Sequence, residues 1–240
     1  MAGVIEFLTA PQTIAYAVVV GIVFMGLQIM AAVMVYAERK VAAFMQQRVG
    51  PLRVGPQGLL QPVADIVKLF FKEELRPKAA DAFLFSLAPI ISVTAAYLAF
   101  APVPFGGPTT FFGLLEQPID LMISDVNVAV LVIFAVASMG VYGIVLAGWA
   151  SNSKYSLLGG LRSSAQMISY ELAYGMAIAT VVLMANSMSL KEIVEAQGGY
   201  WFGFIPKWYI FPQIVGFFVF ACAGIAETNR APFDFPEAEQ

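Results

Sequence analysis

The sequence predicts an all-α integral membrane protein, with about five transmembrane helices in this chain and one cytoplasmic amphipathic helix. Three observations lead to this fold class. Hydrophobic residues make up 60% of the 240 residues and charged residues 12%, whereas a soluble domain is about half apolar and a quarter charged. Long stretches carry no Asp, Glu, Lys or Arg. These stretches do not alternate with period two, so helices are expected rather than barrel strands.

The uncharged stretches are 7–37, 82–115, 126–153 and 208–226, and residues 163–190 contain a single charge, Glu171. A helix of roughly 20 apolar residues crosses the hydrocarbon of a bilayer. We therefore expect one membrane domain over residues 1–240, with spans at about 14–37, 82–101, 127–149, 163–186 and 208–226. The first span is expected to be retained, because MAGVIEF has no Lys or Arg and its apolar run is too long for a signal peptide.

The distribution of Lys and Arg predicts the orientation, since cytoplasmic loops retain these residues. Of the 13 Lys and Arg, only Lys191 and Lys207 follow the second or fourth span. The others follow the first, third or fifth span. This asymmetry places the N-terminus outside and the charged loops on the cytoplasmic side. We expect a multi-pass protein of a bacterial plasma (inner) membrane.

An amphipathic helix is expected on the cytoplasmic side at about 59–74, after the pairs Gly50-Pro51 and Gly55-Pro56. Its apolar residues recur at helical spacing, and its polar residues form one stripe. The stripe consists of Gln61, Asp65, Lys68 and Lys72. Such a helix can lie on the membrane surface. An acid gains nothing from anionic lipid, however, so Asp65 favours a partner protein or a lined cavity.

Glu171 is the most informative single residue, because it lies within an apolar segment nine residues after Arg162. A rise of about 1.5 Å per residue places it roughly 13 Å along the helix from that charge. Acids at such depth usually mark ion or proton pathways. The alternative is a structural Glu that is hydrogen-bonded to a neighbouring helix, with Tyr170 and Tyr174 as possible donors.

Further carboxylates are expected on the same side of the membrane. Alone, Glu38 and Glu227 would be ordinary residues at the ends of spans. With the others they make a set of acids on one side of the membrane or within it: Glu38, Asp65, Glu171, Glu227, Asp234, Glu237 and Glu239. Arg39, Lys68 and Arg230 lie among them. If these groups meet, they titrate together, which suits a proton relay.

Several site types are excluded by residue content. The chain has one cysteine, Cys222, and no histidine. An iron–sulfur cluster requires about four thiolates and zinc requires several Cys or His, so we expect no metal site. The chain also lacks a phosphate-binding loop and a dinucleotide fingerprint. We expect no nucleic-acid partner.

Three segments carry a family resemblance. They are ERKVAAFMQQRVGPLRVGPQGLLQPVADIVKLFFKEELRP (38–77), WASNSKYSLLGGLRSSAQMISYE (149–171) and AETNRAPFDFPEAE (226–239). They closely resemble the quinone-channel, H-type membrane subunit of respiratory complex I, the proton-pumping NADH:quinone oxidoreductase. The resemblance covers the whole chain, in spacing as well as residue type. Members of that family have eight spanning helices, so the chain is expected to be C-terminally incomplete.

The resemblance implies a function and partners. The chain would form part of the quinone-access chamber and couple quinone reduction to proton translocation. Quinone would be a substrate, and NADH, flavin and iron–sulfur clusters would lie in partner subunits. Those partners would be the peripheral quinone-site and iron–sulfur subunits, the neighbouring small membrane subunits and the antiporter-like subunits.

The resemblance also assigns roles to residues. The acids Glu38, Asp65, Glu171, Glu227, Asp234, Glu237 and Glu239 would relay protons. The residues expected in the quinone chamber are Arg39, Lys68, Arg230 and Phe233. The loop from Glu227 onward would be the family's functional inner loop.

Two other functions remain open. One is the equivalent subunit of an energy-converting hydrogenase or of a ferredoxin- or deazaflavin-linked complex. The other is a non-catalytic membrane anchor for a peripheral enzyme, which has no need of an acid at the depth of Glu171. A secondary transporter is disfavoured, since the sequence shows no inverted repeat.

Overall fold

The computed structural model describes residues 11–73, 75–110, 118–228 and 233. In this part of the chain the secondary structure is mainly helical, with two short antiparallel hairpins. The prediction of an all-α membrane protein is confirmed. Three helical segments are long and apolar enough to cross a membrane: Thr13–Met45, Ala129–Ala150 and Lys154–Ala185. Two shorter apolar helices accompany them. The chain divides into two compact units, Met1–Leu75 and Arg76–Gln240, which are described separately.

The first unit contains one long helix, α2 (Pro11–Met45). It continues past the predicted end of the first span at residue 37, so Glu38 and Arg39 lie within the helix. The sequence VAAFM that follows contains no Gly or Pro to end it. Large apolar side chains are exposed along α2, for example Met30 and Met34, each 63% exposed. Such exposure fits a helix that faces lipid.

A compact turn and a short helix complete the first unit. The turn is η1 (Pro56–Gly58), and the helix is α3 (Gln61–Phe70), which packs against α2. Gly58 has φ +79°, and a Cβ there would lie 2.2 Å from the Pro51 carbonyl oxygen, so this position requires glycine. The Tyr36 hydroxyl donates to the Gln57 carbonyl over 3.0 Å. Helix α3 is shorter than the predicted 59–74; residue 74 lies outside the described residues.

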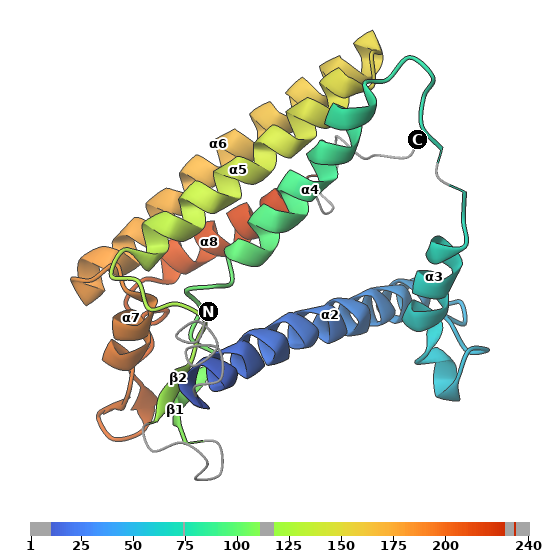
Figure 1. The fold of residues 1–240 in the computed structure, drawn as a ribbon. Helices are drawn as coiled ribbons and strands as arrows, with labels where there is room; N and C mark the ends of the chain where they lie inside the picture. The colour runs from blue at the N-terminus through green and yellow to red at the C-terminus, as the bar shows by residue number, and fades with distance from the viewer. Residues whose placement is uncertain (1–10, 74, 111–117, 229–232, 234–240) are drawn as a thin grey trace, which may run out of the picture. The chain divides into compact units, whose positions relative to one another are not determined.

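The second unit is built on four helices that lie side by side (Figure 1). They are α4 (Ala82–Leu98), α5 (Ala129–Ala150), α6 (Lys154–Ala185) and α8 (Ile214–Glu227). Helix α5 packs on α4 and on α6, and α8 also packs on α6. Asp81 caps α4, because its carboxylate accepts from the backbone N–H groups of Phe83 and Leu84, each at 3.0 Å.

Small residues allow these helices to approach closely. A Cβ on Gly148 of α5 would lie 2.8 Å from the Ser156 carbonyl oxygen of α6 and 3.4 Å from the Gly160 Cα. Gly143 likewise leaves room for the side chain of Ser92 in α4. A Cβ at Gly143 would lie only 2.0 Å from the serine Oγ. Small residues at such crossings are typical of membrane helix pairs. These contacts fix the register that positions the side chains facing α6.

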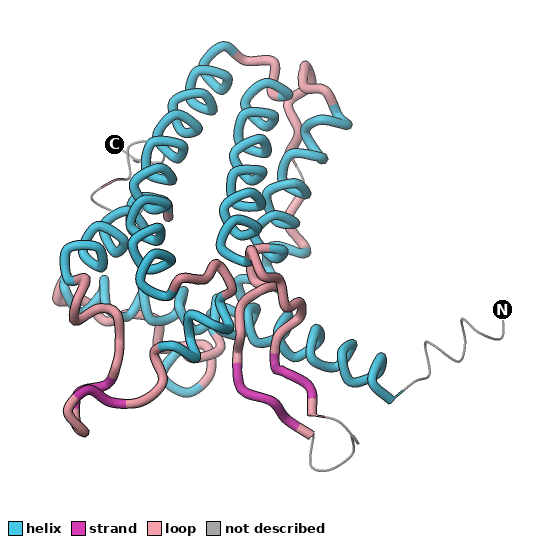
Figure 2. The backbone as a smooth tube through the Cα atoms, turned by 90° about the vertical axis from the view of Figure 1, so that its left-hand side faces the viewer, coloured by secondary structure: helices cyan, strands magenta, loops and turns pink. Residues whose placement is uncertain are grey.

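One end of the helical layer carries the hairpins and a short helix (Figure 2). The elements are β1 (Gly106–Thr109), β2 (Ile119–Leu121), α7 (Leu190–Ala196), β3 (Tyr200–Trp201) and β4 (Ile205–Pro206). Strand β1 pairs with β2 and β3 with β4, both antiparallel. Lys191 of α7 donates to Asp120 of β2 over 2.6 Å. This hydrogen bond raises the pKa of Lys191, so the ion pair persists at neutral pH.

Two helix boundaries in the second unit differ from the predicted spans. Helix α6 begins at Lys154, before the predicted 163, so Arg162 lies within it. Helix α8 begins at Ile214, after the predicted 208. Pro212 explains the second difference, because a proline disfavours helical backbone in the residue before it and supplies no N–H.

Candidate functional site

In the first unit, the structure joins two predicted site residues, Arg39 of α2 and Asp65 of α3. Arg39 donates to one oxygen of the Asp65 carboxylate. The Gln61 amide donates to the other oxygen over 3.1 Å. The Arg39 hydrogen bond, followed by that of Gln61, lowers the pKa of Asp65 below its ordinary 3.8, and the charge of Lys68 adds to this. Asp65 is therefore ionised at neutral pH.

The polar stripe of α3 thus has a partner within its own unit. Asp65 is held between α2 and α3, while its side chain remains 32% exposed. Lys68 lies one turn further along α3 and contributes charge to the same place. Glu38 precedes Arg39 in α2 and makes an interaction of its own. The unit therefore presents acids and cations together on two adjacent helices.

In the second unit, Glu171 lies in the middle of α6 and faces α5. The Ser138 hydroxyl of α5 is hydrogen-bonded to Oε1 of Glu171. The same Ser138 Oγ lies 2.9 Å from the carbonyl oxygen of Phe134, one turn earlier in α5. The sequence suggested Tyr170 and Tyr174 as partners for this acid. The partner found is Ser138, which sequence reasoning missed.

Glu227 lies at the last turn of α8, and it interacts electrostatically with Glu171 of α6. Tyr174 also lies within range of the Glu227 charge. The structure therefore brings together two acids that lie far apart in the sequence. Like-charged carboxylates that interact do not ionise independently.

Tyr174 stands beside the acid pair and forms the centre of an aromatic stack. Its ring stacks on Phe220 of α8, with centroids 4.4 Å apart. On the other side it meets Phe134 of α5 edge-on, with centroids 5.8 Å apart. A Cβ on Gly224 would lie 3.6 Å from the Tyr174 ring, so the glycine leaves room for it. The aromatic stack, Phe134–Tyr174–Phe220, thus joins α5, α6 and α8.

Phe233 is the one predicted residue of the inner loop beyond Glu227 that the structure describes. Its ring meets the ring of Tyr170 edge-on, with centroids 5.4 Å apart. Its carbonyl oxygen accepts from the Gln166 amide over 2.8 Å. Phe233 therefore contacts α6 next to Glu171. The other predicted loop residues, Arg230, Asp234, Glu237 and Glu239, lie outside the described residues.

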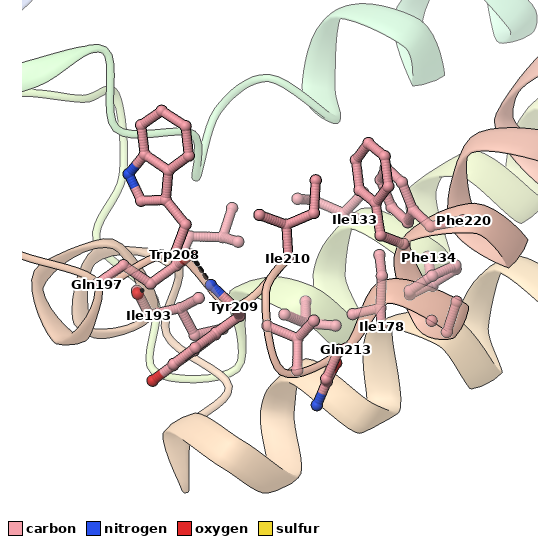
Figure 3. Close-up of a pocket in the computed structure, with 16 residues that line it drawn as sticks. Ile133, Phe134, Ile178, Ile193, Gln197, Trp208, Tyr209, Ile210, Gln213 and Phe220 are labelled. Carbon is pink, nitrogen blue, oxygen red and sulfur yellow. Dashed lines mark hydrogen bonds between the residues drawn. The ribbon is translucent and has the colours of Figure 1, made fainter. Parts of the chain in front are cut away.

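An apolar cavity of about 540 Å³ lies beyond the aromatic stack, among α5, α6, α7 and α8. Figure 3 shows its walls, which include Phe134 and Phe220 of the stack. Two glutamines also line it, and both are hydrogen-bonded within the chain. Gln213 exchanges two 2.7 Å hydrogen bonds with Thr180. Gln197 donates to the Ile193 carbonyl and accepts from the Tyr209 N–H, each at 3.1 Å.

None of the predicted site residues that the structure describes lines this cavity. Sequence reasoning missed it because its walls come from four elements whose packing the hydrophobic pattern does not specify. Across the described ranges 11–73, 75–110, 118–228 and 233, no group of three His, Cys, Asp or Glu side chains has metal-binding geometry.

Comparison with known proteins identifies a family. The family model for NADH dehydrogenase matches residues 17–240. The NADH-quinone oxidoreductase H-type subunit numbered 2 of Geobacter metallireducens is 51% identical over 245 residues, which cover 98% of this chain and 69% of the relative. The H-type subunit numbered 1 of Geobacter sulfurreducens is 51% identical, covering 91% of this chain and 63% of the relative.

A third relative has a different subunit name. NADH-quinone oxidoreductase subunit 8 of Rhodothermus marinus is 53% identical over 210 residues, covering 88% of this chain and 58% of the relative. The chain therefore spans between 58% and 69% of the length of these three relatives.

Proposed function

This chain belongs to the NADH dehydrogenase family, and on that premise we propose that it is a membrane subunit of a proton-translocating NADH:quinone oxidoreductase. It would lie in a bacterial plasma membrane, form part of the quinone-access chamber and couple quinone reduction to proton movement. The names of its relatives support the complex. The arrangement of Glu171, Ser138 and Glu227 supports the coupling role.

The chemistry of electron transfer belongs to partner subunits in this proposal. The chain has one cysteine and no histidine, too few ligands for an iron–sulfur cluster. NADH, flavin and iron–sulfur clusters would be held by the peripheral subunits. Quinone would be the substrate that this chain helps to admit, and two electrons and two protons convert it to quinol.

The first unit would supply one wall of the quinone chamber. Arg39 and Lys68 offer cationic N–H donors that suit the carbonyl oxygens of a quinone head. Asp65 holds Arg39 in place through their ion pair. Glu38 lies beside Arg39 and would exchange protons at this wall. The exposed apolar surface of α2 would face the quinone tail and lipid.

The second unit would hold the proton that responds to quinone reduction. Glu171 lies within an apolar helix and interacts with Glu227, so a change of charge on one acid alters the proton affinity of the other. Proton uptake by reduced quinone leaves negative charge on the acids that supplied the protons. We propose that Asp234, Glu237 and Glu239 are those donors, with Arg230 among them. Glu227 would pass the change on to Glu171.

The loop contact at Phe233 supports this path. Phe233 lies against Tyr170, the neighbour of Glu171, and its backbone is bonded to Gln166. Phe233 is thereby connected to the helix that carries Glu171. We propose that Phe233 also packs against quinone when the chamber is occupied.

The single observation that carries the proposal is Glu171, an acid within an apolar helix that is bonded to Ser138 and coupled to Glu227. Affinity purification of the tagged native chain from mild-detergent membranes tests the assignment. We expect peripheral iron–sulfur subunits, bound quinone and NADH:quinone reductase activity to co-purify. A hydrogenase or a ferredoxin-dependent enzyme without quinone would instead support the related complexes. Capture of a peripheral enzyme whose activity does not depend on this chain would indicate an anchor.

A further inference from the structure

We propose that Ser138 is a positioning residue whose hydroxyl turns between two acceptors as Glu171 gains and loses a proton. This inference rests on the proposed role of Glu171 as a proton carrier. The observation behind it is that Ser138 Oγ contacts both Glu171 Oε1 and the Phe134 carbonyl oxygen, the latter at 2.9 Å. Sequence motifs do not mark this serine, which lies on a different helix from the acid.

The two contacts cannot both receive the serine proton at once, because a hydroxyl has one hydrogen and can also accept. When Glu171 is ionised, Ser138 donates to its carboxylate. When Glu171 is protonated, the carboxyl group donates to Ser138 Oγ, and the serine hydrogen turns to the Phe134 carbonyl. The serine keeps its own proton in both states. In each state every hydroxyl hydrogen of the two side chains therefore has an acceptor, and no heavy atom has to move.

The surroundings of Glu171 make this hydroxyl important. Helices α5 and α8, which pack on α6, contain no Lys or Arg. Among the described residues, Glu227 of α8 interacts with Glu171 through its charge, and Tyr170 and Tyr174 flank the acid in α6. Among the described residues, Ser138 supplies the side-chain hydrogen bond to this acid. A hydrogen bond to a charged group is stronger than one to a neutral group, so Ser138 favours the ionised form.

Removing the hydroxyl should therefore make Glu171 retain its proton at higher pH. In the variant Ser138→Ala, the ionised carboxylate loses its donor in an apolar setting. We expect the pH profile of proton translocation to move upward by about one unit, the size of effect typical of one charge-assisted hydrogen bond. Ser138→Thr retains a hydroxyl with the same bonding capacity, so it should restore the original profile.

The experiment compares Ser138→Ala and Ser138→Thr in the complex purified with this chain. Infrared difference spectra report the C=O band of protonated Glu171, which is assigned by its loss in Glu171→Gln. We expect the band to lie at higher frequency in Ser138→Ala than in the native complex. In Ser138→Thr it should lie at the native frequency. The matched control is Ser164→Ala in α6. The Ser164 hydroxyl also donates a hydrogen bond to a backbone carbonyl one turn earlier, that of Gly160 at 2.8 Å, but it does not contact an acid.

The two readouts separate this inference from the function on which it rests. If the Glu171 band and the pH profile are the same in Ser138→Ala as in the native complex, the positioning role is overturned. If Ser164→Ala changes both as strongly as Ser138→Ala, the effect belongs to helix packing, and the inference is also overturned. Failure of the proposed function would appear elsewhere, as normal proton translocation by Glu171→Gln.

Discussion

Arg39 of α2 and Asp65 of α3 form an ion pair that joins the long helix of the first unit to its short amphipathic helix. Gln61 occupies the remaining oxygen of Asp65, so the acid is held from both sides. This ion pair explains why an acid, Asp65, stands among the lysines of the polar stripe. A role at the membrane surface alone did not explain that acid. Its partner lies on the neighbouring helix rather than in the lipid.

Loss of this ion pair should weaken quinone binding more than assembly. In Asp65→Asn the side chain keeps its size, but Arg39 loses its charged partner and is no longer held. Because exposed ion pairs contribute modestly, we expect the KM for quinone to rise about two- to fivefold. Glu73→Gln, an exposed acid just beyond α3, is the matched control. Unchanged quinone kinetics in both Asp65→Asn and Arg39→Gln would exclude a role for the pair.

The same pair predicts a pH response of the first unit. The pKa of Asp65 is lowered in the folded chain, so the pair contributes above the ordinary pKa of 3.8 and is lost as pH falls through the lowered value. Spin labels at exposed Val41 and Leu69 measure the distance between α2 and α3. The distribution of distances between the labels should stay unchanged from pH 7 down to about 4 and should broaden only at lower pH. In Arg39→Gln we expect a broad distribution of distances at every pH. A change in the distance distribution of the native chain near pH 6 would contradict the prediction.

The crossing of α5 and α6 should not tolerate a single added methyl group at Gly148. A Cβ there would lie 2.8 Å from a backbone oxygen of α6, which cannot move aside as a flexible side chain could. Overpacking of this kind costs about 1–3 kcal/mol, so Gly148→Ala should lower the amount of assembled complex severalfold. Gly159→Ala is the matched control, because a Cβ at Gly159 would meet nothing within 4 Å. Equal yields of the two variants on native gels would show that the close approach is not required.

The aromatic stack should separate the partly buried acids, Glu171 and Glu227, from the apolar cavity. Phe220 contacts Tyr174 beside Glu171 and also lines the cavity. Phe220→Ala would remove the ring between the cavity and the acids and admit water, so we expect increased passive proton leak in proteoliposomes, with less net translocation per quinol. Phe218→Ala removes the same ring from the exposed side of α8, where the residue is 69% exposed, and serves as the control. Equal leak in both variants would show that the stack is not a barrier.

The hydrophobic pattern predicted which segments form long helices better than it predicted where those helices begin and end. Charge excludes a residue from lipid but does not break a helix, so α2 continues beyond Glu38 and α6 begins before Arg162. The opposite error occurred at α8, where an apolar stretch was taken as helix although Pro212 precedes its start. Burial in lipid and helical backbone are separate properties, and composition reports the first.

The candidate site was predictable residue by residue but not in its contacts. Glu171 was conspicuous because an acid within apolar sequence is costly. Its partner Ser138 was not, since a serine in an apolar helix carries no sign of which neighbour it faces. The register that brings them together depends on close approaches such as that of Gly148 to α6. The Arg39–Asp65 pair was missed for the same reason, because only packing shows which residues meet.

The most direct test of the central claim is the number of protons translocated per quinone reduced by the complex carrying Glu171→Gln. The amide keeps the size of the side chain and its bonding to Ser138 but cannot carry a proton. We expect normal assembly and loss of most of the protons translocated per quinone reduced, because the amide cannot take up and release a proton. Glu192→Gln, in α7 at the other end of the unit, should translocate protons normally. Normal assembly and normal translocation in Glu171→Gln would contradict the account.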